Sequence, residues 1–183
     1  MVKNWTVFSV SAIPNRAICD YFSILEDTLI GTMLHPFRRT IHRKAVASVK
    51  FYFFDIGVAN HLAGRSNIVP HTELFGKSFE QFIFCELRAW LDYVSDTRPL
   101  TFWRDYAGHE IDFLIGDEIA IEVKSTAMVC EKHLKNLTMF SEEIKLKYKI
   151  VVSLDSAPRL LGDVQIVPWR EFLVRLWRGE YAA

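Results

Sequence analysis

The sequence predicts an α/β fold built on a central mixed sheet, and three observations lead to this. Short segments alternate between apolar and polar residues, as strands do, while others carry apolar residues at helical spacing. The segment 148–154 is almost continuously apolar, which is typical of a strand buried on both faces. Half of the 183 residues are hydrophobic and 14% are aromatic. A substantial core is therefore available, and the length suits one medium domain or two small ones.

The first region, residues 1–70, is expected to form a winged-helix-like segment. Ser11 is a suitable N-cap for a helix whose apolar positions run from Ala17 to Leu29. Two strand-like runs, 32–36 and 49–54, follow, and a short helix begins near residue 55. A helix followed by a hairpin is the outline of a winged helix.

The connection between these two strands is basic. It contains Arg38, Arg39, Arg43 and Lys44, and no acidic residue occurs from residue 28 to residue 54. A basic wing commonly touches the phosphate backbone of nucleic acid, so these residues are candidate DNA contacts. A solvated hairpin tip explains the same charges, and both interpretations stay open.

The second region, residues 71–183, is expected to follow the order α-β-β-β-α-β. Ser78 and Gln81 suit a capping box at the start of a helix that ends near residue 93, with Glu80 in its first turn. The remaining expected elements are strands over 100–104, 110–115 and 119–124, a helix over 131–147, strands over 148–154 and 164–167, and a terminal helix over 169–177.

The most informative pattern is a pair of strands around Gly116-Asp117-Glu118. A three-residue loop here places Asp112 opposite Glu122, with Cβ atoms roughly 4.5–5.5 Å apart and Lys124 on the same face. Two carboxylates at that spacing suit one divalent cation, Mg²⁺ or Mn²⁺, beside an ammonium group. The alternative is a plain solvated face on which Glu110 and Lys124 form a cross-strand ion pair.

Two further residues are candidates for the same site. Glu80 would complete the metal coordination from the helix that precedes the strands. Arg104, on the neighbouring strand, would contact phosphate, although an ion pair with Asp105 or Glu110 explains it equally well.

Composition limits the other functional classes. Lys and Arg total 22, as do Asp and Glu, so net charge favours neither acidic nor basic partners. The three cysteines are widely spaced, and the sequence shows neither a signal peptide nor an apolar span. Together these features indicate reduced thiols in a cytoplasmic protein. Gly76-Lys77-Ser78 fails as a phosphate-binding loop, because its first glycine would fall at His71, so no ATPase activity is expected.

The conjunction of motifs resembles one family along residues 10 to 170. These motifs are Tyr21-Phe22-Ser23-Ile24-Leu25-Glu26-Asp27, Lys50-Phe51-Tyr52-Phe53-Phe54-Asp55-Ile56-Gly57, Phe79-Glu80, Phe102-Trp103-Arg104, Glu110-Ile111-Asp112-Phe113 and Ile121-Glu122-Val123-Lys124. They resemble a domain of unknown function that lies C-terminal to the P-loop module of prokaryotic AAA-type ATPases. The Asp and Glu-x-Lys part also resembles the PD-(D/E)xK nuclease superfamily, with Ile111 in place of its Pro.

These resemblances imply a function and a partner. Asp112 and Glu122 would hold Mg²⁺, Lys124 would assist the attacking water, and DNA would be the substrate. The partner would be a P-loop ATPase domain, and this chain resembles a fragment severed from a longer ATPase. The alternative is a catalytically silent nuclease fold that serves an ATPase as a DNA-binding or interaction module.

Overall fold

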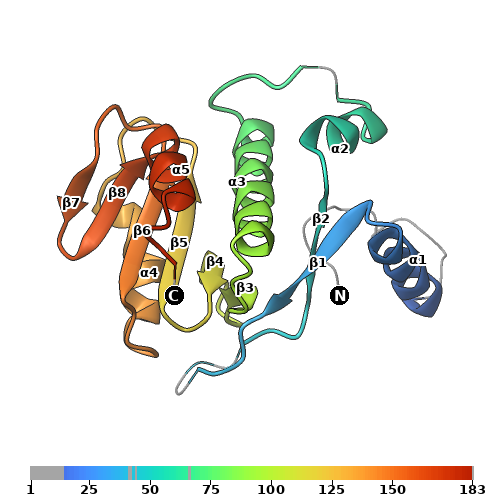
Figure 1. Cartoon of the computed structure of the whole chain (residues 1–183), viewed down its shortest axis with the longest axis horizontal. Helices are drawn as coiled ribbons and strands as arrows, with labels where there is room; N and C mark the ends of the chain where they lie inside the picture. The colour runs from blue at the N-terminus through green and yellow to red at the C-terminus, as the bar shows by residue number, and fades with distance from the viewer. Residues whose placement is uncertain (1–14, 41–42, 44, 66, 183) are drawn as a thin grey trace.

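The computed structural model describes residues 15–40, 43, 45–65 and 67–182, which form an eight-stranded mixed sheet with helices on both faces (Figure 1). The strand order is β2-β1-β3-β4-β5-β6-β8-β7. The strands are β1 (Gly31–Pro36), β2 (Lys50–Phe53), β3 (Leu100–Arg104), β4 (Glu110–Ile115), β5 (Ile119–Lys124), β6 (Tyr148–Ser153), β7 (Arg159–Leu161) and β8 (Val164–Pro168). The helices are α1 (Asn15–Asp27), α2 (Ile56–Leu62), α3 (Glu73–Tyr93), α4 (Lys135–Phe140) and α5 (Trp169–Trp177). The expected N-cap Ser11 lies outside the described residues.

The N-terminal helix and hairpin occur as expected, but the hairpin is part of the central sheet. β1 and β2 pair antiparallel, and α1 packs on them through Phe22 and Phe51, whose ring centroids are 4.7 Å apart. Beyond this hairpin β1 runs parallel to β3, with His35 beside Thr101. Strands on both sides of residue 70 therefore share one sheet, and the division into domains 1–70 and 71–183 stays a prediction.

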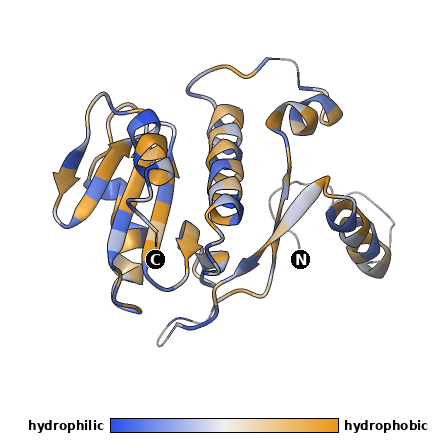
Figure 2. Cartoon of the chain, in the orientation of Figure 1, coloured by the Kyte–Doolittle hydropathy of each residue, from blue (hydrophilic) through white to orange (hydrophobic). Residues whose placement is uncertain are grey.

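The core has two layers, one on each face of the sheet. α3 and α5 cover one face, with Trp90 and Phe172 fully buried there. α4 covers the other face, where Phe140 packs against Trp103 at a centroid distance of 5.0 Å. β5, β6 and β8 run parallel between these layers. β6 is covered on both faces, as its near-continuous apolar sequence predicts. Its second half is hydrophobic in Figure 2.

The long helix α3 begins six residues earlier than the capping box predicts. Its N-cap is Thr72, whose Oγ1 accepts a hydrogen bond from the backbone N–H of Phe75 at 3.2 Å. Ser78 is instead buried inside the helix, where its Oγ lies 3.4 Å from Nδ2 of Asn60. The first-turn position expected for Glu80 is therefore wrong, and the helix terminus is not what stabilises its charge.

The helix expected over 131–147 is also shorter. A single 3₁₀ turn, Glu131–His133, precedes α4, which ends at Phe140. The chain then turns, and the backbone N–H groups of Lys147 and Tyr148 both donate to the carbonyl of Glu118. Those two hydrogen bonds place the beginning of β6 beside β5, so the chain at residues 147 and 148 is extended and not helical. The short strand β7, exposed at the edge of the sheet, was not anticipated.

The register of the β4–β5 hairpin is the one predicted. Phe113 pairs with Ile121 and Ile115 with Ile119, which leaves a three-residue loop and places Asp112 opposite Glu122 by extension. A regular strand over 110–115 would place Ile111 and Phe113 on one face and Leu114 on the other, but β4 does not alternate in this way. Ile111 and Leu114 belong to the same hydrophobic cluster, whereas Phe113 belongs to the other. The β3–β4 pairing shifts register at this point, so two β4 residues, Asp112 and Phe113, lie opposite one β3 residue.

Candidate functional site

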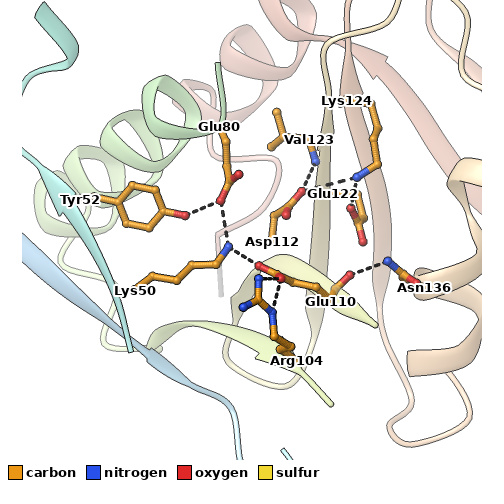
Figure 3. A network of polar contacts seen from close by, with 10 residues as sticks. All are labelled: Lys50, Tyr52, Glu80, Arg104, Glu110, Asp112, Glu122, Val123, Lys124 and Asn136. Atoms are coloured by element: carbon orange, nitrogen blue, oxygen red, sulfur yellow. Dashed lines mark hydrogen bonds and ion pairs between the residues drawn. The ribbon is translucent and has the colours of Figure 1, made fainter. Parts of the chain in front are cut away.

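A network of charged side chains lies where β4 and β5 separate, beside the middle of α3 (Figure 3). Its members come from five elements, of which β2 and α3 are distant in sequence from the three consecutive strands β3, β4 and β5. They are Lys50 and Tyr52 of β2, Glu80 of α3, Arg104 of β3, Glu110 and Asp112 of β4, and Glu122 and Lys124 of β5. The structure thus brings Glu80, Asp112, Glu122 and Lys124, all expected from the sequence, into one neighbourhood.

Asp112 takes a position that the bulge in β4 makes available. The regular β4–β5 ladder ends at the pair Phe113 and Ile121. Beyond it, Oδ2 of Asp112 accepts a hydrogen bond from the backbone N–H of Val123 at 2.8 Å. The Asp112 carboxylate therefore lies between the two strands where they separate. It accepts the hydrogen bond from β5 that a backbone carbonyl of β4 would accept in a regular ladder.

Glu122 is the most buried carboxylate of the site, with 1% of its surface exposed. Its Oε2 lies 2.5 Å from Nζ of Lys124, which is 3.9 Å from Oδ2 of Asp112. Its Oε1 is buried and accepts no hydrogen bond from the described residues, and in its protonated form Glu122 hydrogen bonds to the carboxylate of Asp112. Burial, and then the negative charge of Asp112, raise the pKa of Glu122 well above its usual range, and Lys124 offsets only part of this.

Lys124 is held charged by the two carboxylates beside it. Burial alone would lower its pKa, but the negative charges of Asp112 and Glu122 raise the pKa above its ordinary value. The pattern expected of the hairpin, two carboxylates with one ammonium, is therefore present, although Glu122 lies in a covered layer rather than on a wet face.

Glu80 is held by two residues of β2 that the sequence did not assign to the site. Nζ of Lys50 lies 2.9 Å from Oε1 of Glu80 and 2.5 Å from Oε1 of Glu110. The hydroxyl of Tyr52 donates to the same Glu80 oxygen at 2.5 Å. Lys50 and Tyr52 are two apart in an otherwise apolar strand, so they share a face. That spacing of a lysine and a tyrosine is the signal in the sequence that points to both residues.

Arg104 forms an ion pair with Glu110 through Nε and Nη2. This is one of the two alternatives that the sequence left open for it. Because Glu110 is engaged by Arg104 and Lys50, it does not pair with Lys124 as the solvated-face alternative required.

The donor set at Asp112 and Glu122 fits a hard divalent cation. Two carboxylates supply oxygen ligands, and Mg²⁺ commonly binds one or two carboxylates and keeps several waters. A cation would provide a partner for the buried oxygen of Glu122 and would offset the repulsion between Glu122 and Asp112. Glu80, by contrast, is occupied by Lys50 and Tyr52. Within the described parts of the chain, no group of three or more His, Cys, Asp and Glu side chains is suited to hold a metal.

The basic residues proposed to contact DNA fall into different environments. Arg38 and Arg39 are exposed, and Arg39 is 3.9 Å from the exposed carboxylate of Asp117. Arg43 instead forms ion pairs with Glu142, at 3.3 Å, and Glu143, at 3.2 Å, just after α4. Lys44 lies outside the described residues. Nucleic-acid binding by this segment stays a prediction.

Comparison with known proteins places this site across two family models. A model described as Domain of unknown function (DUF4143) matches residues 75–172, and another, Domain of unknown function (DUF8612), matches residues 7–68. Domains of the first kind are usually found alongside AAA ATPase domains. No curated protein and no solved structure is detectably similar to the chain. Among the described residues, no helix is long and apolar enough to cross a membrane.

Proposed function

Since this chain belongs to the DUF4143 domain family, we propose that it is the nuclease-like partner of an AAA-type ATPase and cleaves DNA phosphodiester bonds with Mg²⁺. The observation that carries the proposal is the convergence of Asp112, Glu122 and Lys124, with one buried oxygen of Glu122 left unpartnered. The order α3-β3-β4-β5-α4-β6 supports a PD-(D/E)xK-like core, and α1 with the β1–β2 hairpin supports a winged-helix-like start.

Each residue of the site has a role in this proposal. Asp112 and Glu122 bind the cation, which supplies Lewis-acid polarisation of the phosphate and activation of a water. Lys124 orients the attacking water or donates to the phosphate oxygens as negative charge develops on them. Arg104, fixed by Glu110, lies at the edge of the site, where it can meet a phosphate.

The test is metal binding measured together with cleavage. Asp112→Asn and Glu122→Gln should each abolish cleavage and weaken Mg²⁺ binding in calorimetry, because each removes an anionic ligand. Lys124→Met should retain the cation but slow cleavage by roughly 10²–10⁴-fold, the usual contribution of a group that transfers or positions a proton. Asp117→Asn is the matched control, since Asp117 is an exposed aspartate in the loop of the same hairpin. Absence of divalent binding at millimolar concentration, with and without DNA, would exclude the catalytic role.

A second function is favoured by a different observation. Lys50, Arg104 and Lys124 all have carboxylate partners within the site. Such internal pairing suits a silent nuclease fold that binds DNA or an ATPase domain and keeps its charges as a structural network. In that case Asp112→Asn would lower the free energy of unfolding, while the unmodified protein would bind no Mg²⁺ and cleave nothing.

A further inference from the structure

The buried ammonium group of Lys50 stands among the acidic residues of the site. Lys50 is 3% exposed, and its Nζ is 5.2 Å from the centre of the Phe102 ring. The same Nζ is within hydrogen-bonding distance of Glu80 and Glu110, at 2.9 and 2.5 Å. It therefore occupies the place between these two carboxylates where a cation would otherwise bind.

Lys50 comes from a different part of the chain than the carboxylates it joins. It belongs to β2, within the stretch matched by the DUF8612 model, whereas Glu80 and Glu110 lie within the DUF4143 match. The N-terminal segment thus completes the charge balance of the site. β2 fixes the position of the Lys50 ammonium group because β2 pairs with β1, where Leu34 lies opposite Lys50.

The four carboxylates divide into two pairs with different partners. Glu80 and Glu110 share Lys50, and each has a further donor, Tyr52 and Arg104 respectively. Asp112 and Glu122 share Lys124, Asp112 also accepts from the backbone N–H of Val123, and Glu122 retains a buried oxygen without a partner among the described residues. Glu80 and Glu110 therefore each have two protein donors, whereas Glu122 has one donor and a buried oxygen left for a cation.

We infer that Lys50 is a built-in counter-cation that restricts the site to one divalent ion, held by Asp112 and Glu122. The inference rests on the proposed metal centre and specifies its stoichiometry. A second divalent ion between Glu80 and Glu110 would meet the Lys50 charge at contact distance, where like charges repel strongly. Two-metal nucleases hold their ions roughly 3.5–4 Å apart. In this chain, the protein's own ammonium takes the place of the second ion.

Replacing Lys50 should open the second position. The side chains of Glu80 and Glu110 are 20% and 18% exposed, so water and ions can reach them once the ammonium is gone. Lys50→Met keeps the aliphatic length and removes the charge, and Lys50→Arg keeps the charge. Lys77→Met is the matched control, because Lys77 lies on the same helix as Glu80 but pairs with Glu73 on the surface.

The experiment counts Mn²⁺ ions bound to the full chain, by calorimetry and by electron paramagnetic resonance, without nucleic acid. The unmodified protein, Lys50→Arg and Lys77→Met should bind one Mn²⁺ with the spectrum of an isolated ion. Lys50→Met should bind one more, with the spin coupling of two neighbouring ions.

The outcomes separate this inference from the proposed function. If the unmodified protein binds no Mn²⁺ and Lys50→Met binds one, the Asp112–Glu122 centre fails, while the exclusion of an ion from Glu80 and Glu110 by Lys50 stands. Equal numbers in the unmodified protein and Lys50→Met would overturn the role of Lys50. Two coupled ions in the unmodified protein would overturn it as well, and that measurement does not depend on whether any variant folds.

Discussion

At the scale of single residues, Glu122 is where stability and function conflict. A carboxylate that is 1% exposed, beside Asp112, is costly to ionise, and one of its oxygens has no partner. A packed core would not keep such a group for stability alone, since a neutral side chain of the same shape avoids the cost. In the proposed function, this cost accompanies the role of Glu122 as a ligand of the cation.

Glu122→Gln should change how stability depends on pH. The pKa of Glu122 is raised by folding, so between its unfolded value near 4.5 and its folded value the native state binds more protons than the unfolded state. Stability must then fall as pH rises through that window, by up to about 1.4 kcal/mol per pH unit. Glu122→Gln lacks this decline, so its free energy of unfolding should rise relative to the unmodified protein from pH 5 towards neutrality.

Urea unfolding with a chelator present, at several pH values, measures this difference. Glu131→Gln is the control, because Glu131 is an exposed glutamate of the 3₁₀ turn before α4. Parallel pH curves for Glu122→Gln and the unmodified protein would show that folding does not raise this pKa.

At the scale of elements, the β1–β2 ladder determines where Lys50 and Tyr52 stand. Gly31 begins β1 opposite Phe53 and packs directly under the ring of Phe51. A Cβ added at Gly31 would lie 2.2 Å from Cζ of Phe51 and 2.7 Å from the carbonyl oxygen of Tyr52. Only glycine allows the two strands to approach this closely, so the placement of both site residues depends on it.

Gly31→Ala should lower the free energy of unfolding by about 1–3 kcal/mol, the usual cost of overpacking. Because the clash includes the backbone of Tyr52, β2 must move and the hydrogen bond to Glu80 should weaken. Thermal unfolding measures the first effect, and the tyrosine ultraviolet spectrum measures the second. Gly57→Ala is the control, since its added methyl meets only the Asp55 side chain at 3.0 Å in exposed α2 and should change stability by no more than about 1 kcal/mol. Equal effects of the two substitutions would contradict the role given to the ladder.

At the scale of the whole molecule, the arrangement of charge matters more than its sum. The formal net charge is zero. Of the basic stretch between β1 and β2, Arg38 and Arg39 are exposed, whereas Arg43 is tied to Glu142 and Glu143 across the fold. Among the described residues of this segment, Arg38 and Arg39 are therefore the ones available to attract nucleic acid.

The salt dependence of DNA binding should separate these residues. Each phosphate contact contributes about −0.9 to the slope of log K against log salt. The double variant Arg38→Ala/Arg39→Ala should make the slope shallower by roughly 2, as measured by fluorescence anisotropy with duplex DNA. Arg43→Ala should leave the slope unchanged and lower thermal stability instead. A slope unaffected by the double variant would place any bound DNA elsewhere on the molecule.

The sequence by itself determined most of the elements and most of the candidate site. Apolar periodicity is a local property, so it located β3, β6, β8 and α5 closely, and the Gly116-Asp117-Glu118 break set the hairpin register. Asp112, Glu122 and Lys124 could be grouped because the residues lie on adjacent strands joined by one short loop. Local pattern was less reliable at helix ends, where Ser78 resembled an N-cap but is a buried residue of α3.

Only the tertiary structure decided which distant residues meet. Lys50 reaches Glu80 and Glu110 because β2 packs against α3, and no local pattern encodes contacts across 30 and 60 positions of sequence. The bulge opposite Phe102 also depends on how β3 pairs with β4, not on the sequence of β4 alone. The chemistry of the site could be read from residue types, whereas its charge balance depends on long-range packing, which places a lysine from the N-terminal segment among the carboxylates.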